Sequence, residues 1–151
     1  MSIKFAKSII INSNPEFIFD YTQDYGKRLQ WDTFLIKADL VGGATAAAKG
    51  VKAYCVAHNN IGMETEYVSF NRPKSTAVKM TAGPYLFKQF LGSWNFKELA
   101  VNQTEVTFLY SFQLNFPFNL VGFFVKQILQ KNVMQRLVDL KGCVEKKNLS
   151  L

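Results

Sequence analysis

Hydrophobic and polar residues follow two different periods along this chain. The segment Ile3–Ile11 is rich in β-branched and apolar residues, which predicts a first strand. From Phe34 onward apolar residues recur at every second position, which is typical of half-buried strands. After Phe116-Pro117 they recur at spacings of three and four, which is typical of an amphipathic helix. The pattern therefore predicts a strand, then a sheet, then one long helix.

Two short helices are expected between the first strand and the sheet. Asn14 can cap a helix, Pro15 suits the first helical position, and Glu16 favours the positive end of the helix dipole. This helix should end near Asp24, and a second helical piece should span Tyr25–Trp31.

Short turns separate the strands that are expected next. Pairs such as Gly42-Gly43, Asn59-Asn60 and Gly83-Pro84 are turn formers. Strands that follow one another through such turns form an antiparallel meander. The expected strands are Leu35–Val41, Val51–His58, Met63–Phe70, Thr76–Ala82, Phe87–Leu99 and Glu105–Leu114.

The C-terminal helix is expected to span Asn119–Lys146. The order of elements predicts an α+β fold in which one curved antiparallel sheet wraps around this helix. A helix about 10 Å wide cannot fill the whole concave side of such a sheet. The remaining space must hold large side chains or a ligand. The helix positions expected to face the sheet are Val125, Leu129, Val133, Leu137, Leu140 and Val144.

The composition agrees with one domain that has a large apolar interior. The chain has 151 residues and no linker-like segment, so residues 1–151 are expected to form a single domain. It contains 14 Phe, and 15% of its residues are aromatic. This aromatic load is enough for a sizeable core with material left over.

The net charge of +7 arises mainly from dispersed lysines, since only three arginines occur. A basic surface favours docking on a ribosome or an anionic membrane. The scarcity of arginine argues against sequence-specific nucleic-acid binding. The N-terminus lacks a sustained apolar run, and the longest apolar segment, Phe116–Leu129, is shorter than a membrane span. A cytoplasmic location is therefore expected.

Few residues are candidates for chemistry. His58 is the only histidine, and it stands at a strand end beside a turn, where a surface position is more common than a catalytic one. Glu64 and Glu66 alternate on one strand and are expected on a solvent face, paired with lysines. Cys55 and Cys143 are not spaced as metal ligands, and no nucleophile motif or phosphate loop is present. Neither a metal nor a cofactor is expected.

The aromatic residues are the remaining candidates. The stretch GPYLFKQFLGSWNF, Gly83–Phe96, crowds rings around a Gly-Pro turn, and the last strand carries Phe108, Tyr110 and Phe112 on one face. By residue type alone these rings fit a filled core and the wall of an apolar cavity equally well. The residues predicted to bind a ligand are Trp31, Tyr54, Tyr67, Phe90, Trp94, Phe108, Tyr110, Phe112 and Phe124.

A family resemblance favours the cavity. The order of elements and the segments IIINSNPEFIFDYTQDYGKRLQW and LVDLKGCVE resemble the polyketide cyclase/dehydrase and lipid-transport family of the START/Bet v 1-like superfamily. The resemblance implies a helix-grip fold with a deep apolar cavity between the sheet and the long helix. Gly83-Pro84 and the run Gly92-x-Trp94-x-Phe96 are similar to the coenzyme Q-binding branch, whereas Trp31-Asp32 departs from the pattern of that branch.

Three functional hypotheses follow. The leading one is binding or transport of a small hydrophobic ligand, such as a lipid, an isoprenoid quinone or a polyketide-like molecule. The second is a polyketide cyclase or aromatase, for which the resemblance implies cavity Arg, Tyr and Trp side chains; Arg28, Arg72 and Arg136 are not expected to point inward. The third is a basic interaction module. Peripheral membrane contact is expected from an apolar rim made by Gly83–Phe87 and Phe116–Phe118.

Overall fold

The first helix begins at Pro15, directly after the capping residue Asn14, as the sequence predicts. The computed structural model describes residues 2–149, so residues 1, 150 and 151 of the predicted domain lie outside the described residues. Helix α1 (Pro15–Gln23) follows Asn14, whose Oδ1 accepts a hydrogen bond from Phe17 N at 2.7 Å. This bond satisfies one of the amide groups that the first helical turn leaves without a partner.

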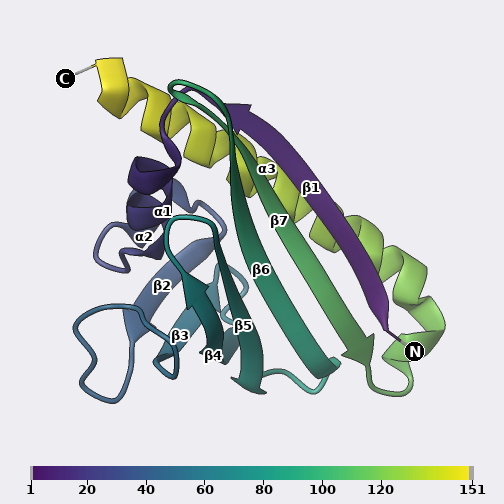
Figure 1. The fold of residues 1–151 in the computed structure, drawn as a ribbon. Helices are drawn as coiled ribbons and strands as arrows, with labels where there is room; N and C mark the ends of the chain where they lie inside the picture. The colour runs from purple at the N-terminus through teal and green to yellow at the C-terminus, as the bar shows by residue number, and fades with distance from the viewer. Residues whose placement is uncertain (1, 150–151) are drawn as a thin grey trace.

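The strands form one antiparallel sheet in the order β1-β7-β6-β5-β4-β3-β2 (Figure 1). Strands β2 to β7 form the predicted meander, and β1 returns to the edge of β7. The predicted strands are confirmed, with ends shifted by one or two residues. Their bounds are β1 (Ile3–Ile11), β2 (Leu35–Leu40), β3 (Lys52–Ala57), β4 (Gly62–Asn71), β5 (Ser75–Ala82), β6 (Phe87–Ala100) and β7 (Gln103–Leu114).

The second helix is shorter than the sequence predicts. Helix α2 comprises only Arg28–Trp31, because the chain from Asp24 to Lys27 forms a turn. Asp24 holds this turn: its Oδ1 accepts from Gly26 N at 2.9 Å, and its carbonyl oxygen accepts from Lys27 N at 3.0 Å.

The long C-terminal helix packs differently along its two halves. A 3₁₀ turn η1 (Phe118–Val121) leads into α3 (Gly122–Leu149), which runs along the long strands of the sheet (Figure 1). In the N-terminal half, Val125 and Leu129 are only partly buried. Helix α3 therefore closes one end of the sheet tightly and leaves the other end open. The fully buried residues of α3 begin one turn after Leu129 and are Val133, Leu137, Leu140 and Val144.

Aromatic side chains cover the inner face of β6 and β7, as their alternation predicts. The rings of Trp94 and Phe108 have centroids 4.0 Å apart, and those of Phe90 and Tyr110 are 4.7 Å apart. Cross-strand ring pairs of this kind stabilise a sheet and fix the orientation of its inner face.

Candidate ligand-binding site

A cavity of about 340 Å³ lies between the inner face of the sheet and the N-terminal half of α3. Val125 and Leu129 of α3 form one wall, and rings of β6 and β7 form the opposite wall. The lining residues that reach solvent include Asn59, Ile61 and Ile128. The cavity therefore opens between the β3–β4 turn and α3.

The structure brings five of the nine predicted ligand-binding residues together in this cavity. Trp31 and Phe112 are buried in the adjoining core, and the ring of Trp31 lies edge-on to Trp94 with centroids 5.9 Å apart. Ligand contact by any of these residues stays a prediction. The five that line the cavity are Tyr67, Phe90, Trp94, Phe108 and Tyr110.

Tyr54 and Phe124 do not lie where the sequence analysis placed them. Tyr54 is on the outer face of β3, because its buried neighbour Ala53 faces inward; its ring lies 5.9 Å from Lys37 Nζ. Phe124 is 66% exposed, because it precedes the inward-facing Val125 on α3 and falls on the outer side of the helix.

A buried ion cluster forms the polar end of the cavity. Asp32 Oδ2 accepts from Arg28 Nε and from Arg136 Nη2, each at 2.8 Å, and Oδ1 accepts from Arg136 Nε at 3.1 Å. Arg136 Nη1 donates to the Tyr110 hydroxyl at 2.7 Å. The two arginines and the aspartate are 6%, 5% and 1% exposed, respectively. Because Arg28 and Arg136 both line the cavity, the expectation that no arginine points inward is wrong.

The sequence contained a signal for one of these arginines. Arg136 follows Val133 by three positions and precedes Leu140 by four, so it lies on the apolar face of α3. A charged residue on a buried helix face requires a partner. The identity of that partner was not accessible from spacing, because Asp32 is 104 residues away.

The ion cluster carries one positive charge in excess. Burial alone would raise the pKa of Asp32, but Arg136 and Arg28 lower that pKa to about 2, so the carboxylate is ionised at neutral pH. Burial favours loss of the proton from Arg28 and Arg136, yet Asp32 keeps the pKa of both guanidinium groups above its usual value. An anionic ligand oxygen would balance this charge, and a neutral carbonyl oxygen could accept a hydrogen bond from the guanidinium groups.

The other polar groups in the cavity are hydroxyls, side-chain amides and a thiol. Tyr67 donates to Gln23 Oε1 at 2.6 Å, and its hydroxyl lies 3.2 Å from that of Tyr25. Burial raises the pKa of Tyr67 and of Tyr25, and burial also raises the pKa of the Cys55 thiol, which lines the cavity. These groups are therefore protonated, and the Cys55 thiol is not activated as a nucleophile.

Other candidates from the sequence lie outside the cavity. His58 is exposed, and Glu64 lies 3.9 Å from Lys52 Nζ, an ion pair of the kind predicted for it. No group of three or more possible metal ligands occurs among residues 2–149. No helix in this part of the chain is long and apolar enough to cross a membrane. A second hollow, of about 520 Å³, has Asp20, Asp24 and Arg72 in its lining and is less suited to an apolar ligand.

The sequence profile of the polyketide cyclase / dehydrase and lipid transport family matches residues 2–145. The chain belongs to this family. No curated protein matches the sequence. The family assignment agrees with the resemblance of the N-terminal and C-terminal segments, whereas the coenzyme Q-binding branch is not singled out.

Solved structures with little sequence identity share the fold. The Zhui aromatase/cyclase from Streptomyces sp. R1128 has a TM-score of 0.82 at 10% identity, covering 97% of this chain and 96% of the other. A START superfamily protein from Mycobacterium smegmatis has a TM-score of 0.79 at 13% identity, covering 95% and 97%. The α+β helix-grip fold predicted from the sequence is confirmed.

The ion cluster makes the free energy of unfolding depend on pH in the acid range. The pKa of Asp32 is lowered from 3.8 to about 2 in the folded protein, so its stabilising contribution is complete above about pH 4 and disappears as pH falls toward 2. At pH 7, Asp32→Asn should lower the free energy of unfolding by about 3–5 kcal/mol, because it leaves buried arginines unpaired.

Urea titrations at several pH values measure this contribution. Asp39→Asn is the matched control, because Asp39 pairs with Lys37 on the surface at 3.9 Å. The wild type should lose more stability between pH 4 and pH 2 than Asp32→Asn does. If the free energy of unfolding fell equally with pH in these two proteins, the assignment of the lowered pKa to Asp32 would be contradicted.

Proposed function

We propose that this protein binds or carries a small hydrophobic molecule, such as a lipid, an isoprenoid quinone or a polyketide-like compound, in the cavity beneath α3. The observation that carries the proposal is a cavity of about 340 Å³ with aromatic and aliphatic walls and charged side chains at one end only. Ligand sites of small molecules have this volume and this distribution of polarity. Residues 1–151 would act as one ligand-binding domain, and a cytoplasmic location stays a prediction from the sequence.

The polar end favours a ligand that carries an oxygen function. Among the hydrogen bonds of residues 2–149, Arg28 reaches Asp32 through Nε, and none joins its terminal amino groups to a carboxylate. A carboxylate, enolate or carbonyl oxygen of the ligand could accept from these groups, while the apolar body lies against Phe90 and Trp94. Burial of the body supplies affinity, and the arginine supplies orientation.

A cyclase or aromatase is the second candidate, and the ion cluster is the observation that favours it. Arg28, Arg136 and Tyr110 line the cavity and offer donors to a developing enolate oxygen. Cyclisation also requires a group that accepts a proton. Burial raises the pKa of Tyr67, Tyr25 and Cys55, so these groups are protonated and do not accept a proton, and the carrier function is better supported.

Narrowing the cavity should weaken ligand binding. Val78 lines the cavity, so Val78→Phe should weaken binding of the uncharged fluorescent probe N-phenyl-1-naphthylamine about tenfold or more. Ala77→Phe is the matched control on the neighbouring, outward-facing position of β5, and it should leave the dissociation constant within about twofold. Equal fluorescence titrations for both variants would place the probe outside this cavity.

Removing the excess charge should change ligand preference rather than general affinity. Arg28→Gln leaves Asp32 paired with Arg136, so the cluster becomes neutral. It should weaken binding of the anionic probe 1-anilinonaphthalene-8-sulfonate about tenfold, the effect of one charge-assisted hydrogen bond, and spare the uncharged probe. The ratio of the two dissociation constants is the readout. An unchanged ratio would show that the cluster does not contact the ligand.

The cyclase candidate has a separate test. The protein is added to a minimal polyketide synthase that releases an unreduced poly-β-ketone, and the products are separated by liquid chromatography and mass spectrometry. A carrier should leave the pattern of ring closure unchanged. A new pattern that Tyr110→Phe removes would establish the cyclase instead, because this variant retains the ring and deletes the hydroxyl next to Arg136.

A further inference from the structure

An exposed apolar patch lies beside the cavity opening. It comprises Tyr85 of the β5–β6 loop, Phe116 and Leu120 around η1, and Phe123, Phe124 and Ile128 of α3, and each of these side chains is between 59% and 73% exposed. Ile128 also lines the cavity, so the patch and the opening are continuous.

Specific contacts hold the parts of this patch together. The Tyr85 hydroxyl donates to the Phe116 carbonyl oxygen at 3.1 Å, and Asn115 Nδ2 donates to the Tyr85 carbonyl oxygen at 2.6 Å. The rings of Phe123 and Phe124 lie 6.0 Å apart. The loop, η1 and the start of α3 therefore present one surface.

Folding does not account for this surface. On the C-terminal half of α3 the apolar residues Leu137 and Leu140 are fully buried, as in an ordinary amphipathic helix. On the N-terminal half Phe123 and Phe124 face solvent instead. Contiguous exposed apolar residues of this extent mark an interaction site.

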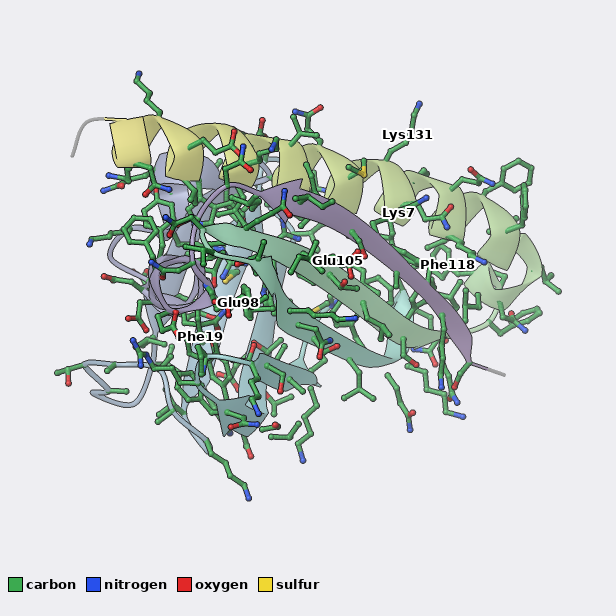
Figure 2. The ribbon with its side chains drawn as sticks, turned by 45° about the horizontal axis from the view of Figure 1, so that its top comes forward. Lys7, Phe19, Glu98, Glu105, Phe118 and Lys131 are labelled. Carbon is green, nitrogen blue, oxygen red and sulfur yellow. The ribbon has the colours of Figure 1, made fainter. Side chains whose placement is uncertain are left out.

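The charges around the patch are positive. The segments that carry it, residues 67–97 and 106–138, contain no Asp or Glu. Lys88, Lys126 and Lys131 belong to these segments, and Lys131 projects outward from α3 in Figure 2. Glu64 lies opposite Ala82 in the register of β4 and β5, near the loop that carries Tyr85. The negative charge of its carboxylate is compensated by Lys52, whose Nζ lies 3.9 Å away. In Figure 2, Phe118 lies where α3 begins, whereas Glu98 lies toward its other end.

We propose that the apolar patch and its lysines dock the protein on an anionic bilayer, with the cavity opening turned toward the lipids. Aromatic rings among lysines suit the interface between headgroups and acyl chains. A second copy of the chain fits less well, because a symmetric contact would bring Lys126 and Lys131 of both copies together. The proposal goes beyond ligand binding: it assigns the bilayer as the place where the cavity exchanges its ligand.

Vesicle flotation tests the docking. The protein should float with vesicles of phosphatidylcholine mixed with phosphatidylglycerol, and less with phosphatidylcholine alone. Phe123→Ser with Phe124→Ser should reduce the bound fraction about tenfold or more. The matched control, Leu99→Ser with Val101→Ser, alters exposed residues near the β6–β7 turn and should leave flotation unchanged.

The lysines require their own comparison. Lys126→Gln with Lys131→Gln should lower binding to the anionic vesicles several-fold, whereas Lys74→Gln with Lys97→Gln removes the same charge elsewhere and should not. Binding of N-phenyl-1-naphthylamine without vesicles is measured for each variant. It should be retained, so that failure of docking is distinct from failure of ligand binding.

Three outcomes would overturn the proposal. The first is absence of flotation with either type of vesicle. The second is an equal loss in both lysine pairs, which would indicate diffuse adsorption by net charge. The third is a wild-type protein that does not bind vesicles and forms a dimer in analytical ultracentrifugation. If the Phe123→Ser and Phe124→Ser pair converted this dimer to a monomer, the patch would be assigned to self-association.

Discussion

The salt bridges of Asp32 to Arg28 and Arg136 fix the position of α3 relative to α2 and β7. Three charged groups are withdrawn from water at this point, and each would be costly if its partners moved away. Arg136 extends the constraint to β7 through the Tyr110 hydroxyl. Because these contacts have specific directions, they determine where on the sheet the helix can lie, which apolar contacts alone would determine less sharply.

This constraint also determines where the cavity ends. From Val133 onward the apolar residues Val133, Leu137, Leu140 and Val144 of α3 are fully buried, whereas Val125 and Leu129 before them border the cavity. The rings on β6 and β7 serve both regions: Trp94 and Phe108 pack against each other and also line the cavity. The sequence left a filled core and a cavity wall as alternatives. The structure has both, at different positions along α3.

The order of elements could be predicted because it depends on local patterns. Alternation along β6 and β7 and the spacing of Leu137 and Leu140 on α3 are visible in the sequence and agree with the structure. The contact between Asp32 and Arg136 could not be predicted, because these residues are 104 positions apart and meet only after the sheet has curved around the helix. The pairing of Arg28 with Asp32 is local, since the two are four positions apart.

The wrong placements have equally physical reasons. The face of Tyr54 depends on which residues of β3 turn inward, and the inward residues Ala53, Cys55 and Ala57 are smaller than Tyr54, so size and hydrophobicity did not reveal the inner face. The position of Phe124 depends on the phase of α3 near its start, where both sides of the helix are apolar. Local hydrophobicity does not distinguish the two sides in either case.

The division of α3 into a packed half and a cavity half has a consequence for how such proteins diversify. Substitutions at Val125 or Leu129 would reshape the cavity while leaving Val133 and Leu140, which secure the helix, untouched. Changes of cavity shape can then arise at residues that are less buried than those that secure the helix, within the narrow margin of stability that proteins possess. This separation offers a reason why structures with only 10–13% identity to this chain retain the same architecture.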